Sequence, residues 1–172
     1  MRIAPLLLLF GMSSASIGQA VADSILHDGD YRHYRLFAPS GFTPAENPAL
    51  VLNLHGLGSN SEQQEAYSLM NVVAQEERFL VCYVDGVNNS WNLGLGSIDD
   101  VGLIGALIDR FALTHGVDEE RVYACGISQG GYFSFVLACQ LADRIAAIAT
   151  VAASMAQGLP PSARRHAPCP YS

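Results

Sequence analysis

The stretch 121–144 constrains the fold of this chain more than any other part of the sequence. An apolar, β-branched segment leads into the motif Gly126-Ile127-Ser128-Gln129-Gly130, and a segment of helical character follows it. A strand, a sharp turn and a helix in that order present the motif serine at the apex of the turn. The glycines provide positions without a Cβ where neighbouring backbone has to pass closely. The stretch therefore predicts an exposed, nucleophilic Ser128 above a helix N-terminus, which favours negative charge. The alternative is a glycine-rich turn with an incidental serine.

Length and charge limit the class of protein. The chain has 172 residues, which is the usual size of one domain. It carries nine arginines, no lysine and sixteen acidic residues, so its formal net charge is −7. Such a chain lacks the basic surface that nucleic acids and anionic membranes bind. Half of the residues are hydrophobic, which fits a largely buried sheet.

Residues 1–22 have the pattern of a cleaved signal peptide. A single arginine precedes the apolar run Ile3–Phe10, and Ala20-Val21-Ala22 places small residues around a cleavage site. The apolar run is well short of the ~20 residues that a membrane-spanning helix needs. We therefore expect export to a secreted or periplasmic location, with cleavage after about Ala22 and a mature chain of residues 23–172.

The sequence after residue 22 alternates between strand-like and helix-like segments. Weak alternation on both sides of Asp28-Gly29-Asp30 predicts a β-hairpin over 24–38. Continuous apolar runs predict buried strands over 49–54 and 79–84 and a further apolar strand over 145–153, in addition to the strand before Ser128. This order predicts an α/β fold with a mostly parallel sheet and helices on both of its faces.

Two helices are predicted between these strands. A capping box that starts at Ser61 opens the first helix. A second helix begins after Ser97, ends at Gly116, and has Asp99 and Asp100 as its expected caps. The predicted core-facing residues are Ala66, Leu69, Met70 and Val73 in the first helix, and Val101, Ile104, Ile108 and Phe111 in the second.

Chemically active side chains follow the predicted strands. His55, Asp85, Trp91 and Ser128 each lie just past the carboxyl end of a strand. Open α/β sheets bind their ligands at that edge. The sequence therefore predicts one cleft at the carboxyl edge of the sheet.

The motifs together resemble the secreted polyhydroxybutyrate depolymerase and feruloyl esterase branch of the α/β-hydrolases, from about residue 31 to the end of the sequence. The combination carries the resemblance, because no single motif separates this branch from other esterases. The matching residues are Leu54-His55-Gly56, Val84-Asp85-Gly86, Ser90-Trp91-Asn92, Asp99-Asp100-Val101-Gly102, Arg121-Val122-Tyr123, Gly126-Ile127-Ser128-Gln129-Gly130-Gly131, Cys139 and Ala142-Asp143-Arg144-Ile145-Ala146-Ala147-Ile148-Ala149.

The resemblance implies ester hydrolysis through an acyl-enzyme on Ser128. The backbone N–H groups of Gln129 and Leu57 are expected to bind the oxyanion. Trp91 and Asn92 are expected to line the acyl or aromatic side of the cleft, and a tryptophan that closes a loop over the core fits the pattern equally well. His55 precedes the serine, whereas the base follows it in this fold, so His55 is expected to shape the oxyanion loop.

The chain departs from the family in the residues after Ser128. A serine hydroxyl is a poor nucleophile until a neighbouring base takes its proton. The only histidine after Ser128 is His166, and the only acid is Asp143, which matches a structural position of the family. We therefore expect residues 23–172 to be the N-terminal portion of a truncated esterase domain, from which the C-terminal strands and the catalytic Asp and His are missing.

Four cysteines in an exported chain suggest a disulfide. In the fold that the resemblance implies, Cys82 and Cys125 lie on strands that flank the strand ending at Leu54. Two strand spacings are roughly 10 Å, whereas the Cα atoms of a disulfide lie about 4.4–6.8 Å apart. These two thiols are therefore expected to be buried and free, and Cys139 is expected to pair with Cys169. The spacing typical of metal ligands is absent, so we predict no metal and no cofactor.

The sequence thus predicts a secreted serine esterase that acts on a polyester, a feruloylated polysaccharide or a small acyl ester. A catalytically inactive or binding-only remnant of such an esterase is the alternative, and a peptidase on the same fold is a weaker competitor. Nucleic acids are not expected partners, nor are membranes once the signal peptide is removed. The oligomeric state is left open.

Overall fold

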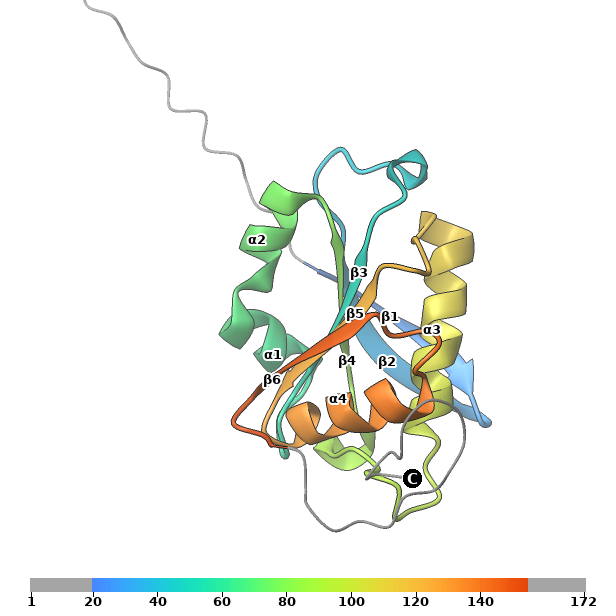
Figure 1. Ribbon diagram of the computed structural model, residues 1–172, viewed down its shortest axis with the longest axis vertical. Helices are drawn as coiled ribbons and strands as arrows, with labels where there is room; N and C mark the ends of the chain where they lie inside the picture. Colours follow the sequence, from blue (N-terminus) through green and yellow to red (C-terminus); the bar gives the residue numbers. More distant parts are fainter. Residues whose placement is uncertain (1–19, 155–172) are drawn as a thin grey trace, which may run out of the picture.

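The computed structural model describes residues 20–154. Within these residues, six strands form one sheet in the order β1-β2-β4-β3-β5-β6 (Figure 1). The strands are β1 (Val21–His27), β2 (Asp30–Phe37), β3 (Leu50–Leu54), β4 (Leu80–Val84), β5 (Val122–Ile127) and β6 (Ala147–Val151). β4, β3, β5 and β6 run parallel to one another, and the hairpin β1–β2 joins the sheet antiparallel to β4. The predicted mostly parallel sheet is confirmed.

β1 and β2 form the predicted hairpin, with Asp28 and Gly29 in the turn. Both turn residues have positive φ, 51° and 86° respectively, which is the conformation that a two-residue hairpin turn requires. β1 begins at Val21, so Val21 and Ala22 are paired with β2 although they precede the expected cleavage site. The rest of the predicted signal peptide, residues 1–19, lies outside the described residues.

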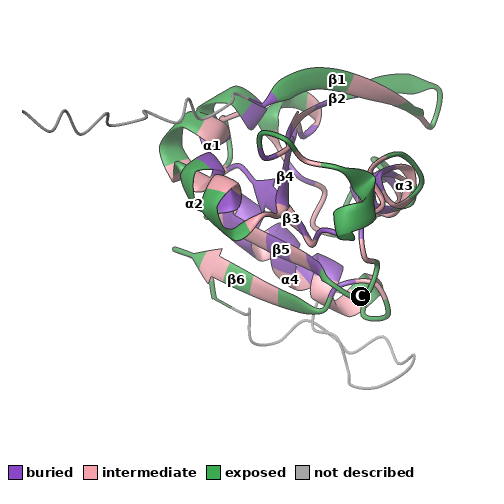
Figure 2. Ribbon diagram, turned by 90° about the horizontal axis from the view of Figure 1, so that it is seen from above, coloured by how far each residue is buried: buried purple, intermediate pink, exposed green. Residues whose placement is uncertain are grey.

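Helices cover both faces of the sheet, as predicted. α1 (Ser61–Ser68) and α2 (Met70–Glu77) lie on one face, and α3 (Asp100–His115) and α4 (Gln129–Gln140) lie on the other (Figures 1 and 2). Short 3-10 turns are η1 (Pro44–Glu46) and η2 (Val87–Asn89). Among residues 20–154, no helix combines the length and the apolar character that crossing a membrane requires.

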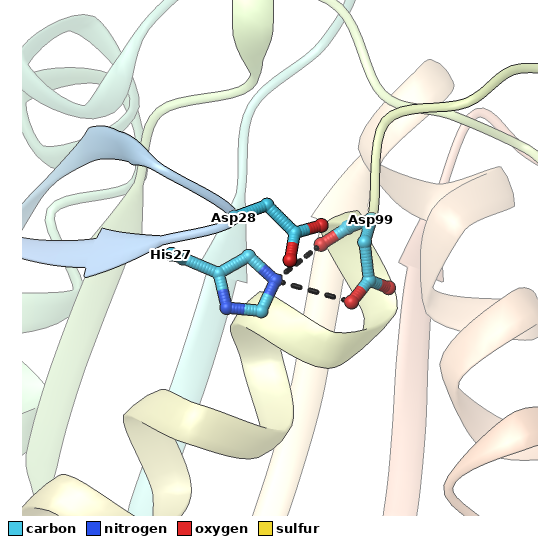
Figure 3. A group of neighbouring side chains, drawn as sticks. All are labelled: His27, Asp28 and Asp99. Atoms are coloured by element: carbon cyan, nitrogen blue, oxygen red, sulfur yellow. Dashed lines mark hydrogen bonds and ion pairs between the residues drawn. The ribbon is translucent and has the colours of Figure 1, made fainter.

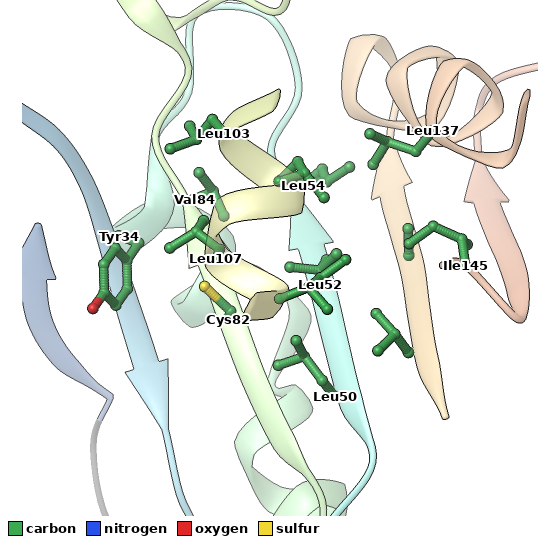
Figure 4. Close-up of a cluster of buried hydrophobic side chains, with 14 of the residues drawn as sticks. Tyr34, Leu50, Leu52, Leu54, Cys82, Val84, Leu103, Leu107, Leu137 and Ile145 are labelled. Carbon is green, nitrogen blue, oxygen red and sulfur yellow. The ribbon is translucent and has the colours of Figure 1, made fainter. Parts of the chain in front are cut away.

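The main hydrophobic core lies between the sheet and the layer formed by α3 and α4 (Figure 4). Alternate residues of each strand point into this core, because successive side chains of a strand face opposite sides of the sheet. The predicted core face of α3 is confirmed, since Ile104, Ile108 and Phe111 are fully buried and Val101 packs against the cluster. A smaller cluster, with Phe37, Ala74, Val81 and Tyr83 among its members, lies on the side of α1 and α2.

The first predicted helix differs from the structure in its cap and its length. The N-cap is Asn60, not Ser61: the Asn60 side chain accepts a hydrogen bond from Gln63 N–H at 2.9 Å. The predicted single helix is divided into α1 and α2 at Leu69, which has a left-handed backbone with a φ of 52°. An asparagine and a serine are both good caps, and only the backbone path decides which of two adjacent residues takes the role.

The buried face of α1 and α2 is polar, so the predicted apolar face is also wrong. Ala66, Leu69 and Val73 are exposed, and Met70 is half-buried. Gln64 Nε2 donates to Asn53 Oδ1 at 2.7 Å, and the Tyr83 hydroxyl donates to Asn71 Oδ1 at 2.9 Å. A buried polar group without a partner costs about 1–3 kcal/mol. The helices therefore turn polar residues toward the sheet, because the polar side chains of β3 and β4 need hydrogen-bond partners.

The positions of the cysteines agree with the predicted strand order. β3 lies between β4 and β5, and Cys82 and Cys125 on these two strands are free thiols. Cys82 is fully buried and Cys125 is half-buried. Burial raises the pKa of both thiols, that of Cys125 to about 11. Cys169 lies outside the described residues, so the Cys139–Cys169 disulfide stays a prediction.

Candidate active site

Ser128 occupies the sharp turn between β5 and α4, as the motif predicts. Its φ of 52° and ψ of −117° lie in a region that residues with a side chain adopt only when their surroundings impose it. Hydrogen bonds hold its backbone on both sides: Ser128 N–H donates to Val151 O at 2.8 Å, and Tyr132 N–H donates to Ser128 O at 3.0 Å. Ser128 is exposed, so its hydroxyl is accessible to a substrate.

Close backbone packing explains the two motif glycines. A Cβ at Gly130 would lie 2.3 Å from Leu54 O and 2.6 Å from His55 O. A Cβ at Gly126 would lie 2.5 Å from the carbonyl carbon of Gly130 and 2.8 Å from Leu54 O. The carboxyl end of β3 thus passes directly against the turn, and any side chain at these positions would push the two apart.

The loop after β3 lies beside the serine. A Cβ at Gly56 would be 3.6 Å from Ser128 Cβ, so this part of the loop contacts the turn. Leu57 follows, with a side chain that is 68% exposed. Among the described residues, neither Leu57 N–H nor Gln129 N–H has a hydrogen-bond acceptor. Free N–H groups near a nucleophile are the kind of donors that bind an oxyanion.

His55 holds this loop through both of its ring nitrogens. Gly86 N–H donates to His55 Nε2 at 3.0 Å, so Nε2 carries no proton, and Nδ1 donates to Gly56 O at 2.8 Å. The residue is completely buried, and burial lowers the pKa of its imidazole below the usual value. These contacts agree with the expectation that His55 shapes the oxyanion loop and does not act as the base.

The pKa of His55 leads to a prediction for the pH dependence of stability. Because the folded protein binds the imidazole proton less tightly than the unfolded chain, the stabilising contribution is complete above pH 6.5. We expect the free energy of unfolding to decrease as the pH falls below that value. Urea unfolding at several pH values measures how the free energy of unfolding changes with pH. This change should be smaller in His55→Gln, because glutamine cannot titrate. His115, whose pKa burial also lowers, remains in both proteins. Identical slopes would contradict the prediction.

Trp91 closes a loop over the core, which is the second of the two interpretations that its motif allows. Only 3% of the residue is exposed. Its ring stacks on Phe133 at a centroid distance of 4.9 Å and lies 4.8 Å from the His55 ring. Its Nε1–H donates to His55 O at 2.9 Å. Trp91 therefore packs against His55 at the start of the loop after β3 and offers little of its surface to a ligand.

The side chain of Gln129 joins the turn to the Trp91 loop, a role that the sequence did not reveal. Gln129 Nε2 donates to Ser90 Oγ at 3.0 Å, and Trp91 N–H donates to Gln129 Oε1 at 3.2 Å. Nothing in the motif specifies these bonds, because Trp91 and Ser90 lie 38 and 39 residues before Gln129 in the chain. The residue that follows Ser128 is thus attached to the loop of Ser90 and Trp91.

Asp99 and Asp100, both expected as helix caps, have different roles. Asp99 is the N-cap of α3, and its Oδ1 accepts from Gly102 N–H at 2.8 Å. Asp100 is 1% exposed and forms an ion pair with buried Arg32 at 2.5 Å. Its other oxygen accepts from Asn92 N–H at 2.7 Å. Asp100 therefore attaches the loop of Trp91 and Asn92 to the hairpin strand β2, and its expected capping role is wrong.

In the described part of the chain, one group of side chains has the geometry of metal ligands, namely His27, Asp28 and Asp99 (Figure 3). Their ligand atoms lie within 4.8 Å of one another. His27 Nε2 lies 3.1 Å from Asp99 Oδ2 and 3.0 Å from Asp99 O. These bonds join the hairpin turn to the cap of α3, and Ser128 is not part of the group. The expectation that the protein binds no metal stays a prediction.

No base for Ser128 is found among residues 20–154. The serine hydroxyl has no hydrogen bond to a histidine or a carboxylate in this part of the chain. His166 lies outside the described residues, and Asp143 is exposed beyond the end of α4. The structure thus brings Ser128, Leu57 and Gln129 together and adds no acid–base partner from the described residues.

The fold and the strained serine turn define a class of α/β proteins in which a serine projects from the carboxyl edge of a mostly parallel sheet. A model of the family described as alpha/beta hydrolase fold matches residues 49–167. The chain belongs to this family.

Relatives of the chain include two esterases. Feruloyl esterase B of Piromyces equi is 34% identical over 125 residues, which are 69% of this chain and 23% of that protein. The bifunctional acetylxylan esterase/xylanase XynS20E of Neocallimastix patriciarum is 29% identical over 131 residues, which are 76% of this chain and 19% of that protein. The chain thus spans less than a quarter of the length of either relative.

Solved structures share the fold. The fluorophosphonate-binding serine hydrolase FphF of Staphylococcus aureus superposes with a TM-score of 0.64 at 17% sequence identity, over 76% of this chain and 56% of that one. At that identity the similarity establishes the fold and nothing further.

Proposed function

We propose that the chain carries the nucleophile and oxyanion site of a secreted serine carboxylic ester hydrolase of the polyhydroxybutyrate depolymerase or feruloyl esterase type. The observation that carries the proposal is the strained, exposed Ser128 at the strand-to-helix turn. Similarity to a feruloyl esterase and to an acetylxylan esterase supports an ester as the substrate. The candidate substrates are a polyester, a feruloylated polysaccharide and a small acyl ester, and the proposed reaction uses no cofactor.

In the proposed reaction, Ser128 Oγ attacks the ester carbonyl carbon while its proton passes to a base. The N–H groups of Leu57 and Gln129 donate to the carbonyl oxygen as it becomes negative. The bond to the alcohol oxygen then breaks, the alcohol leaves with the proton from the base, and the acyl group remains on Ser128. Water attacks the acyl-enzyme, which releases the carboxylic acid and restores the serine hydroxyl.

The base of this mechanism is supplied by none of the residues 20–154, and this favours a second candidate. In that second proposal the chain is an inactive or binding-only form of such an esterase. Positioned bases contribute about 10²–10⁴-fold to enzymatic rates. A chain in which only the base is missing should therefore regain part of this rate enhancement when a base is supplied in solution.

Chemical rescue by imidazole tests the proposed function. We expect imidazole to accelerate p-nitrophenyl acetate hydrolysis by the full chain beyond its own background reaction. Ser128→Ala is the matched control, because it removes the nucleophile and keeps the fold. The imidazole-dependent excess rate should be absent in the control.

Two other outcomes have clear meanings. Equal rates for the full chain and Ser128→Ala at every imidazole concentration would exclude Ser128 as a nucleophile and support the binding-only proposal. Fast hydrolysis without imidazole that Ser128→Ala abolishes would support the esterase and place its base outside residues 20–154.

We also propose that the chain is exported, on the basis of the signal-peptide pattern in residues 1–22. N-terminal sequencing of protein collected from the periplasm or the medium should find Asp23 as the first residue. Cleavage there would remove Val21 and Ala22 from β1 and leave Asp23 to His27 paired with β2. A chain that retains Met1 would contradict the proposal.

A further inference from the structure

Three side chains that carry metal-ligand atoms meet where the hairpin turn contacts the start of α3 (Figure 3). His27 is the last residue of β1, Asp28 lies in the turn, and Asp99 is the N-cap of α3. One ligand atom from each residue lies within 4.8 Å of the other two. We infer that these three residues form a binding site for a divalent cation of the zinc class, separate from the site of Ser128.

The distances between the ligand atoms suit a single ion. Imidazole nitrogen and carboxylate oxygen lie about 2.0–2.2 Å from a bound zinc ion, so two ligands of one ion are roughly 3–4 Å apart. His27 Nε2 is 3.1 Å from Asp99 Oδ2 and 3.0 Å from the Asp99 carbonyl oxygen. Asp28 is exposed, so its carboxylate is free to turn toward the same point. The ion would replace the Nε2 proton that His27 shares with Asp99.

The distribution of charge also favours a cation at this place. Among residues 20–154, every arginine forms an ion pair with an acid other than Asp28 or Asp99. The Asp28 carboxylate has no hydrogen bond or ion pair in this part of the chain, and the only ion pair of Asp99 is with His27. Two carboxylates at this distance repel each other. A divalent cation would neutralise both of them.

The fold holds two of the ligands in place before an ion binds. His27 lies opposite Asp30 in the last pair of the β1–β2 ladder, and its side chain is 15% exposed. Asp99 Oδ1 accepts from Gly102 N–H at 2.8 Å, which leaves Oδ2 directed at His27. Ligands that are already ordered lower the entropic cost of binding.

The types of ligand indicate the class of the cation. An imidazole nitrogen together with carboxylate oxygens suits zinc and related transition metals, whereas calcium and magnesium take oxygen ligands. Three protein ligands leave one tetrahedral position open to water. Sequence spacing does not show this site, because Asp99 follows His27 by 72 residues. The expectation that the protein binds no metal rests on that spacing alone.

Titration of the full chain with zinc chloride tests the inference. The untagged chain is freed of metal with EDTA, dialysed and titrated in a calorimeter, and we expect one zinc ion per chain at this site. Calcium chloride should show no comparable binding. Asp28→Asn should weaken zinc binding at least about tenfold, a loss that changes outside the ligand shell already cause. Asparagine tolerates the positive φ of this turn, so the variant should fold like the parent chain.

His27→Gln is the second test variant. It removes the ligand nitrogen, keeps an amide that can donate to Asp99, and should also weaken zinc binding at least about tenfold. His33→Gln is the matched control, since His33 is exposed on β2 of the same hairpin and is not part of the group. This control should bind zinc like the parent chain.

Four results would each overturn the inference. They are the absence of zinc binding, calcium binding of equal strength, unchanged zinc affinity in Asp28→Asn and His27→Gln, and equal weakening by His33→Gln. None of these measurements depends on ester hydrolysis, so their outcome leaves the proposed role of Ser128 to the imidazole experiment.

Discussion

Replacing Asp100 with alanine should lower the free energy of unfolding by about 3–5 kcal/mol, the cost of removing one partner of a buried ion pair. Arg32 and Asp100 have side chains that are 7% and 1% exposed, and they are 2.5 Å apart. Without the carboxylate, the Arg32 guanidinium would remain buried without a countercharge. Asn92 N–H would lose its acceptor at the same time.

The neighbouring acid provides a matched control. Asp99→Ala removes the N-cap of α3 together with the partly exposed contact between Asp99 and His27, and should cost about 1 kcal/mol. Urea unfolding followed by the emission of Trp91 measures both variants. Adding Arg32→Met to Asp100→Ala removes the unpaired charge, so the double variant should be less destabilised than the sum of the single changes. Equal costs for Asp99→Ala and Asp100→Ala would show that the ion pair does not stabilise the fold.

Replacing Gly130 with alanine should lower the free energy of unfolding by about 3 kcal/mol, the upper end of the usual cost of overpacking. The new Cβ would be 2.3 Å from Leu54 O and 2.6 Å from His55 O. Both are backbone atoms and cannot move as a flexible side chain would. The strand β3 and the serine turn would have to separate, and this should also abolish the imidazole-dependent hydrolysis.

Gly105→Ala is the control for this change. Gly105 lies inside α3, and a Cβ there would have no atom within 4 Å. Alanine is the better helix former by roughly 0.5–1 kcal/mol, so this variant should be slightly more stable than the parent chain. Unfolding in urea compares the two variants directly. A Gly130→Ala protein as stable as Gly105→Ala would contradict the close packing at the turn.

The elements that could be predicted depend on local patterns. The hairpin turn at Asp28-Gly29 needs positive φ at both residues, and asparagine, aspartate and glycine adopt it most readily. The serine turn depends on two glycines at fixed positions around Ser128. The apolar face of α3 repeats at the helical period and packs on an apolar sheet face. In each case, the residues that determine the local structure lie close together in the sequence.

The elements that could not be predicted depend on residues far apart in the chain. The buried face of α1 and α2 was misidentified because Asn53 and Tyr83 of the sheet bind polar helix residues. The sequence around Trp91 is compatible with a residue that lines the cleft and with one that closes a loop over the core. The ring contacts with His55 and Phe133 decide for the second. Helix propensity and periodicity contain no information on the chemistry of the surface that a helix will meet.

The sequence by itself determined the mostly parallel character of the sheet, the hairpin and the serine turn, since each follows from local backbone preferences and from the alternation of strands and helices. Only the tertiary structure decided that Asp99 caps α3 while Asp100 pairs with Arg32. It also decided that Gln129 attaches the turn to the loop of Ser90 and Trp91. The physical reason is that hydrogen bonds and ion pairs between distant segments depend on distances that exist only once the sheet has formed.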